Sequence, residues 1–216
     1  MTNVLLLAEG RNTAEAQGLL PGWMPDAGLD DVGRKQAEMA ALRLREVRFC
    51  AIVTSPLEGC RQTAEVVAKQ RRRDLPVHAE LDLASCRYGD WTGMPLDVVR
   101  KEPLWESVLH VPSAVRFPGG ESLSEMQIRA LHAIGSWNQR LGGESTYVVV
   151  SHGDVIRSIL ADALGLHLDM FRRIEVRPGS ISVIKYQDGP CVVSRLNDDG
   201  SDLTSYSPRR MRRGRK

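Results

Sequence analysis

Residues 4–13 read Val-Leu-Leu-Leu-Ala-Glu-Gly-Arg-Asn-Thr. A continuous apolar run that ends in a small residue, a carboxylate and a glycine is typical of a strand buried on both faces of a sheet. Because an open α/β sheet binds its ligands beyond the carboxyl ends of its strands, Glu9 is the first candidate for chemistry in this chain.

The composition is that of an ordinary soluble protein, and 216 residues are enough for one α/β domain with a sizeable core. No apolar run approaches the ~20 residues that span a bilayer, and the N-terminus lacks the basic region and cleavage site of a secretory signal. The cysteines show no C-x-x-C spacing, which is typical of reduced thiols. We therefore expect a cytoplasmic protein without a membrane partner.

The net charge of +2 hides an uneven distribution. Residues 209–216 hold six basic residues and no acid, so the rest of the chain has 23 basic against 27 acidic residues. Because this end has no apolar pattern, we expect a basic disordered tail over residues 201–216 behind a single domain over residues 1–200. Six charges are weak grounds for a nucleic-acid partner, which we do not expect.

The order of strand and helix patterns predicts the fold class. Besides the first strand, apolar runs predict strands over residues 50–54, 75–79 and 146–150, and a hairpin of edge strands over residues 180–186 and 192–196. Helical spacing predicts helices over residues 31–47, 56–69, 95–109, 121–141 and 155–164, with Val32 in the buried stripe of the first helix. The alternation predicts a three-layer α/β/α sandwich around a mostly parallel sheet.

Several segments resemble motifs of the histidine phosphatase superfamily, the phosphoglycerate-mutase-like fold. They are residues 29–37, 54–64, 88–93, 117–122 and 150–154, in the family's order, and the resemblance extends over residues 1–197. In that family, a nucleophilic histidine attacks phosphorus, two arginines and a second histidine neutralise the phosphoryl oxygens, and a carboxylic acid protonates the leaving group.

This chain departs from the family at most of those positions. The Arg-His-Gly motif of the family corresponds to Ala8-Glu9-Gly10, the second arginine to Gly59 and the acid to Ser85. A family asparagine corresponds to Glu15, and of the central residues only His152 is present, with Gly10, Thr13 and Ser151 as framework. The resemblance therefore implies the fold but a degenerate active site.

Two hypotheses remain for the function. In the first, which we place slightly ahead, Glu9 and His152 form an acid/base pair for dehydration, isomerisation or cyclisation of a small neutral or cationic molecule. In the second, the chain is a non-catalytic pseudophosphatase that acts as a binding or scaffold protein. Residual phosphatase activity is a third and weaker alternative, because it would need Arg11, Arg61 or Arg87 to reach the pocket.

The expected pocket surrounds Glu9 and His152. Its expected lining residues are Ala8, Gly10, Arg11, Thr13, Glu15, Gly59, Arg61, Ser85, Cys86, Arg87, Ser151 and Gly153. For Ser85 and Cys86, ordinary packing is the favoured interpretation. Glu9, Glu15, His152 and a thiol could converge on a metal, but they show no metal-ligand spacing, so no metal site is predicted.

No cofactor is predicted either, since the chain has no Gly-x-Gly-x-x-Gly turn after its first strand and no P-loop. The expected partner is a small-molecule ligand. An exposed edge strand would also allow a homodimer.

Overall fold

A six-stranded sheet forms the centre of the computed structural model, which describes residues 1–71 and 75–200. The strand order is β3-β2-β4-β1-β5-β6. The strands are β1 (Thr2–Ala8), β2 (Ile52–Thr54), β3 (Val77–Ala79), β4 (Ser145–Ser151), β5 (Ile181–Tyr186) and β6 (Val192–Asp198). The tail expected over residues 201–216 lies outside the described residues.

The first four strands of the sheet are parallel. β2 pairs with β3 and β4, and β4 pairs with β1, all in the same direction, whereas β5 and β6 add an antiparallel hairpin beyond β1. The prediction of a mostly parallel sheet is confirmed. Because β2, β4 and β1 are neighbours and parallel, their carboxyl ends meet at one edge of the sheet.

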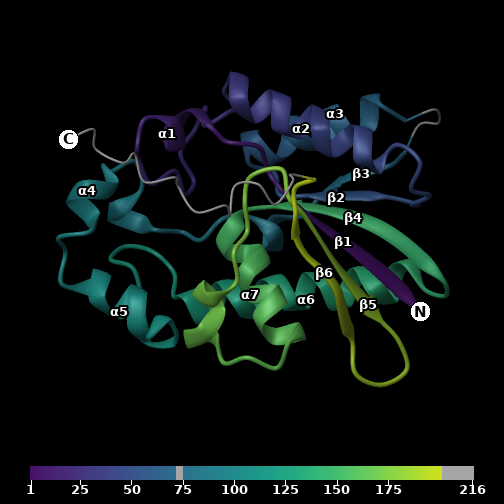
Figure 1. Ribbon diagram of the computed structural model, residues 1–216. Coiled ribbons are helices and arrows are strands. Elements are labelled where there is room, and N and C mark those ends of the chain that lie inside the picture. The colour runs from purple at the N-terminus through teal and green to yellow at the C-terminus, as the bar shows by residue number, and fades with distance from the viewer. Residues whose placement is uncertain (72–74, 201–216) are drawn as a thin grey trace, which may run out of the picture.

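Helices cover both faces of the sheet (Figure 1). α2 (Asp31–Leu44) and α3 (Glu58–Lys69) lie on one face, and α6 (Leu123–Leu141) and α7 (Gly153–Ala163) lie on the other. In β1, Leu5 and Leu7 pack with the first pair of helices, while Val4 and Leu6 pack with the second pair. Since successive strand side chains point to opposite faces, burial on both sides explains the unbroken apolar run of β1.

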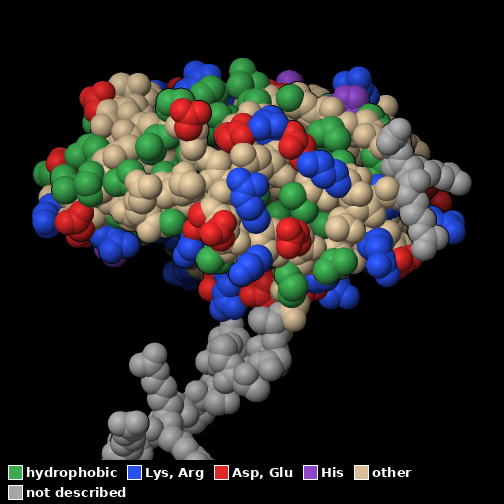
Figure 2. Space-filling model, turned by 90° about the horizontal axis from the view of Figure 1, so that it is seen from above, with side chains coloured by type: hydrophobic (Ala, Val, Ile, Leu, Met, Phe, Trp, Pro, Cys, Tyr) green, Lys and Arg blue, Asp and Glu red, His purple; other side chains and the backbone are tan. Residues whose placement is uncertain are grey.

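Shorter elements complete the chain. They are α1 (Thr13–Ala16), α4 (Leu96–Val99), α5 (Leu104–His110) and the 3₁₀ turns η1 (Leu81–Leu83), η2 (Gly89–Trp91), η3 (Pro112–Ala114) and η4 (Leu168–Arg173). Seen from above α2 and α3, acidic and basic side chains are interspersed and form no large patch of one charge (Figure 2). Among the described residues, no helix has the length and apolar character that crossing a membrane requires.

The structure corrects several element boundaries. The single helix expected over residues 95–109 is two helices, because Pro103 disfavours a helical conformation at residue 102 and α5 starts only after it. α3 begins at Glu58 rather than at Pro56. β5 was expected at an edge, but it pairs with both β1 and β6, so of this hairpin only β6 is an edge strand.

Val32 does not belong to the buried stripe of α2. It is 44% exposed, whereas Ala37, Ala41 and Leu44 are buried. At 3.6 residues per turn, Val32 lies about 140° around the helix from Ala37, outside the arc that faces the sheet. Gly33 falls on that arc instead and is buried.

Candidate functional site

Three neighbouring parallel strands end at the candidate site. Ser55 follows β2, Glu9 follows β1 and His152 follows β4, and these strands are adjacent in the sheet. The backbone N–H of Glu9 donates to the carbonyl of Ser151 at 3.0 Å, which continues the pairing of β1 and β4 by one residue. The end of the sheet thus brings Glu9 and His152 together.

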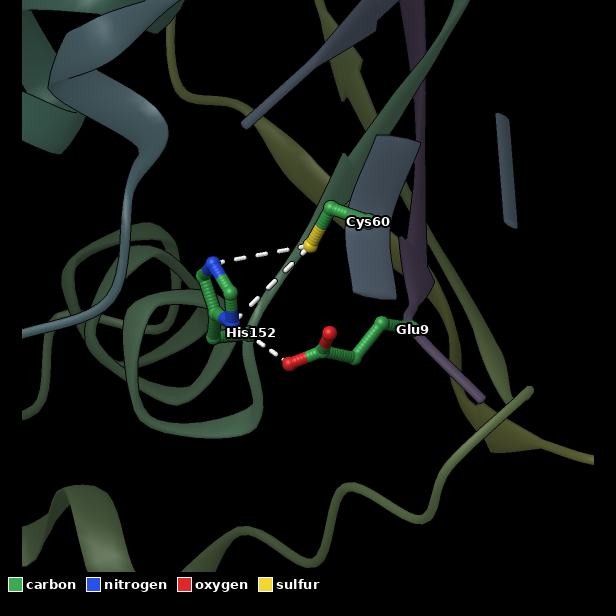
Figure 3. Close-up of side chains that lie close together, drawn as sticks. All are labelled: Glu9, Cys60 and His152. Atoms are coloured by element: carbon green, nitrogen blue, oxygen red, sulfur yellow. Dashed lines mark hydrogen bonds and ion pairs between the residues drawn. The ribbon is translucent and has the colours of Figure 1, made fainter. Parts of the chain in front are cut away.

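The Glu9 carboxylate contacts the imidazole of His152 directly (Figure 3). Glu9 Oε1 lies 2.5 Å from His152 Nδ1, and each residue is only 8% exposed. At this distance one hydrogen has to lie between the carboxyl oxygen and the ring nitrogen, since two unprotonated atoms would repel each other. The pair is therefore a short, buried hydrogen bond.

The other nitrogen of His152 is also occupied. Its Nε2 lies 2.9 Å from the Ser55 Oγ and 3.5 Å from the Cys60 Sγ. The Ser55 Oγ in turn accepts the backbone N–H of Leu57 at 3.2 Å. With partners at both nitrogens, the ring of His152 is held in one orientation.

Cys60 is a member of the site that sequence reasoning missed. Its side chain comes from the first turn of α3 and is fully buried. Burial, together with the negative charge of Glu9, raises the pKa of the Cys60 thiol well above its usual range. The sequence held one indication of this role: Cys60 lies between Gly59 and the Gln62-Thr63-Ala64 motif, in the first turn of the helix that begins near the site.

Glu9 fills the space in front of Gly59. A Cβ atom at position 59 would overlap Glu9 Oε2 and would also touch the carbonyl of Ala27 at 3.4 Å. A glycine is therefore required at position 59 as long as Glu9 holds its conformation.

The remaining cavity is small. Its volume is about 10 Å³, which holds about one water molecule. Glu9, Gly59 and His152 of the predicted lining residues border it, and the others that border it are Asn12, Pro21, Gly22, Met24, Ala27, Leu57 and Glu58. Four of these residues, Pro21, Gly22, Met24 and Ala27, belong to the loop over residues 21–27. This loop therefore covers the site.

The three arginines that could assist a phosphoryl group have other partners. Arg11 Nη2 pairs with Asp30 Oδ2 at 2.5 Å, and Arg61 pairs with Glu58 and Glu65 along α3. The guanidinium of Arg87 stacks 4.6 Å from the ring centroid of Trp23. None of the three borders the cavity.

Ser85 and Cys86 also lie away from the cavity. Ser85 is buried, and its carbonyl accepts hydrogen bonds from Trp23 Nε1 at 2.7 Å and from Arg129 Nη2 at 2.9 Å. Cys86 belongs to the apolar core on the α6 and α7 side of the sheet, where burial raises the pKa of its thiol. Both residues fit the packing interpretation.

The other predicted residues form the frame of the site. Ala8 is buried in the core, Ser151 Oγ donates to the carbonyl of Leu83 at 2.7 Å, and Gly153 begins α7. The backbone N–H of Gly10 donates to Thr63 Oγ1, and that of Thr13 donates to the carbonyl of Gly28.

Glu15 belongs to the turn that follows β1. It forms a capping box with Asn12, a buried residue that borders the cavity and that the sequence reasoning also missed. Although much of Glu15 is exposed, desolvation of its carboxyl group and the negative charge of Glu9 raise its pKa. Glu15 itself does not border the cavity; of the acidic residues only Glu9 and Glu58 do.

The chemistry open to this arrangement follows from its members. A carboxylate, an imidazole and a thiol can exchange protons or bind a metal ion. They offer no cationic group besides His152 to a phosphoryl oxygen.

Comparisons with known proteins identify the wider group to which the chain is similar. The family model described as histidine phosphatase superfamily (branch 1) matches residues 4–199. The "Probable phosphoglycerate mutase GpmB" of Yersinia pestis (strain Pestoides F) is 29% identical over 196 residues, which cover 90% of this chain and 89% of that protein.

Solved structures agree with this match. "Bacillus stearothermophilus YhfR" has a TM-score of 0.85 at 27% identity and covers 92% of this chain and 98% of its own. A putative alpha-ribazole-5'-P phosphatase from Escherichia coli has a TM-score of 0.82 at 23% identity and covers 92% of this chain and 97% of its own, a likeness of fold alone.

Proposed function

This chain belongs to the histidine phosphatase superfamily, and we propose that it is a divergent member that has lost phosphoryl transfer and acts by binding. The observation that carries this proposal is the position of the Glu9 carboxylate. It contacts His152, fills the space in front of Gly59 and leaves a cavity of about 10 Å³. A phosphoryl group does not fit in a space of one water molecule.

The charge of the site supports the same proposal. Relative to the family pattern, the residues at positions 8, 9, 59 and 85 make the pocket about two charges more negative. A carboxylate about 4 Å from one phosphate charge costs about 4 kcal/mol at an effective dielectric near 20. Phosphoryl transfer needs cations to offset this repulsion. Arg11, Arg61 and Arg87 are paired or stacked elsewhere.

The names of relatives would favour a different function. Those names refer to a phosphoglycerate mutase and to a phosphatase. We do not extend these activities to this chain, because it has Glu9 where the resemblance implies the nucleophilic histidine and Gly59 where it implies an arginine.

The test is hydrolysis of an aryl phosphate by the full chain, with His152→Ala as the control for any contaminating phosphatase. We expect no hydrolysis that depends on His152. The double variant Ala8→Arg, Glu9→His should rescue little, because Gly59 and Ser85 still lack the second arginine and the acid. The quadruple variant that adds Gly59→Arg and Ser85→Glu should gain activity. Hydrolysis by the wild-type chain that disappears in His152→Ala would overturn the proposal.

Acid/base catalysis by Glu9 and His152 is the second candidate. The 2.5 Å contact between Glu9 Oε1 and His152 Nδ1 favours it, because such a pair is able to accept and return a proton. The cavity counts against it, since a substrate enters only if the loop over residues 21–27 moves.

Thermal unfolding against fractionated cell metabolites separates the two candidates. A ligand at 100 times its Kd stabilises a protein by about 2.7 kcal/mol. If the acid/base site binds the ligand, the shift in Tm disappears in Glu9→Ala, and a turnover is lost with it. If the chain acts by binding elsewhere, the shift survives that substitution.

A further inference from the structure

Three atoms of the kinds that bind transition metals converge at the end of the sheet. A carboxylate oxygen of Glu9, the Sγ of Cys60 and a ring nitrogen of His152 all lie within 4.8 Å of one another, and all three residues are buried (Figure 3). They come from β1, α3 and β4, which are far apart in the sequence and fixed by the fold. Carboxylate, thiolate and imidazole are the three ligand types that zinc takes in proteins.

We propose that Glu9, Cys60 and His152 bind one divalent transition-metal ion, zinc by the chemistry of the donors. This inference rests on the proposed function, since it assigns a ligand to the site that no longer takes phosphate. The sequence predicted no metal site because Glu9, Glu15, His152 and a thiol show no metal-ligand spacing. The structure identifies the thiol as Cys60, which lies beside His152.

Two of the separations between the ligand atoms can be compared with the edges of a tetrahedral site. Zn–S bonds of about 2.3 Å and Zn–N bonds of about 2.0 Å place the two ligand atoms about 3.5 Å apart in a tetrahedron. Cys60 Sγ lies 3.9 Å from His152 Nδ1. Glu9 Oε1 lies 2.5 Å from the same nitrogen, where a tetrahedral edge is about 3.4 Å. A movement of the Glu9 carboxylate by about 1 Å away from Nδ1 would bring this separation to the tetrahedral value.

The second ring nitrogen of His152, Nε2, already has the partner that metal binding at Nδ1 requires. When Nδ1 binds the ion, the hydrogen of the neutral ring lies on Nε2, and Ser55 Oγ is placed 2.9 Å away to accept it. Metal-binding histidines in proteins nearly always donate their second N–H in this way, which fixes the ring. Ser55 is itself held by the N–H of Leu57.

The cavity supplies the fourth position. With a volume of about 10 Å³ beside Glu9 and His152, it holds about one water molecule and excludes larger ligands. Three protein ligands and one water are the usual set of an open zinc site. The cavity therefore has room for the one water that completes the site of an ion held by the three side chains, but not for an organic substrate.

The charges also balance. As the ion binds, the thiol proton of Cys60 and the hydrogen on Nδ1 of His152 both leave to solvent, and the freed lone pair of Nδ1 binds the ion. The Cys60 thiolate and the Glu9 carboxylate then neutralise the two positive charges of the ion. Binding therefore releases protons and weakens as the pH falls.

Cobalt(II) is the probe, because it replaces zinc in such sites and its bond to a thiolate absorbs light. We expect the metal-stripped full chain to bind one equivalent of cobalt with a thiolate-to-cobalt band, which zinc then abolishes by displacement. Cys60→Ser should lose the band, and Cys50→Ser, which changes an exposed cysteine, should retain it. Ser55→Ala should keep the band but weaken binding about 10–100-fold.

Circular dichroism and the urea unfolding midpoint check that each variant folds. Glu9→Gln provides a second ligand variant that keeps the shape of the pair, and it should also weaken binding. Absence of the thiolate band at stoichiometric cobalt, or an unchanged band in Cys60→Ser, overturns the metal site. Hydrolysis of an aryl phosphate that depends on His152 overturns the proposed function instead, so the two failures are distinguishable.

Discussion

The Glu9 carboxylate occupies the space in which a side chain at position 59 would lie. The Glu9 carboxylate, which extends from the end of β1, lies where any side chain at position 59 on α3 would begin. The two identities are therefore physically linked, because a side chain at position 59 and the observed conformation of Glu9 exclude each other. The contact with His152 holds Glu9 in that conformation.

The first prediction concerns this overlap. Gly59→Ala should destabilise the protein by about 1–3 kcal/mol, because the new methyl group meets Glu9 Oε2 and the Ala27 carbonyl in a packed site. Urea unfolding measures the change. In a Glu9→Ala background the same substitution should cost less, since the overlapping oxygen is gone.

Gly135→Ala provides the matched control for that measurement. Gly135 lies inside α6, and a Cβ there meets no atom within 4 Å. Its replacement should stabilise the protein by about 0.5–1 kcal/mol, because alanine is the better helix former. An equal effect of Ala at positions 59 and 135 would contradict the overlap.

The second prediction concerns the buried pair of Glu9 and His152. Glu9→Ala should cost about 3–5 kcal/mol, because it leaves a buried polar group without its partner. A double-mutant cycle of Glu9→Ala and His152→Ala should give a coupling energy of about 0.5–3 kcal/mol. The measurement is the free energy of unfolding in urea for the four proteins.

An exposed histidine–carboxylate pair on α5 serves as the control. His110 Nε2 lies 3.4 Å from Glu106 Oε2, and both side chains are more than two-thirds exposed. Its coupling energy should be below about 1 kcal/mol. If the two cycles gave the same coupling energy, the Glu9–His152 contact would not be the strong interaction that its geometry indicates.

Much of the fold could be predicted from local patterns. The apolar runs of β1 and β4 locate the central strands because these strands are buried on both faces. The same patterns misplaced the ends of elements. Pro103 splits the expected helix over residues 95–109, and Val32 looked buried from its residue type although it lies on the outer side of α2.

The candidate site could be predicted only in part. Glu9 and His152 follow strand ends, and the order of parallel strands brings strand ends together. Ser55 also follows a strand end, that of β2, and was missed, whereas Cys60 depends on how α3 packs over the sheet, which one sequence does not reveal. The side chains of Arg11 and Arg61 form ion pairs with nearby carboxylates instead of reaching the pocket, and the sequence does not show which of the two they do.

The third prediction concerns thiol reactivity in the native protein. Cys50 is exposed, while Cys60 and Cys86 are buried. In the metal-free chain, burial favours the protonated form of both buried thiols by raising their pKa, and the thiolate is the form that reacts. Iodoacetamide at pH 8 should therefore alkylate Cys50 first and leave Cys60 and Cys86 intact, as peptide mass spectrometry would report. In denaturant all of these thiols should react, and native alkylation of Cys60 as fast as Cys50 would contradict its burial.

The fourth prediction concerns the acid stability that Glu125 provides at the start of α6. Its carboxylate accepts the N–H of Ser122 at 2.8 Å and pairs with Arg116. The hydrogen bond from Arg116, followed by that from Ser122, lowers the pKa of Glu125 from 4.5 to about 2. A depressed pKa in the folded state means that the unfolded state binds the proton more readily. The stabilisation is therefore present above about pH 4.5 and is lost as the pH falls toward 2.

Glu125→Gln should accordingly flatten the acid limb of the stability curve. Between pH 6 and pH 3, the free energy of unfolding should fall less in Glu125→Gln than in the wild type, because the variant has no proton to take up at this position. Glu102→Gln is the matched control, since Glu102 is exposed between α4 and α5 and forms no ion pair with any of the described residues. It should follow the wild-type curve. An equal fall in all three proteins would show that Glu125 is not the source of the acid sensitivity.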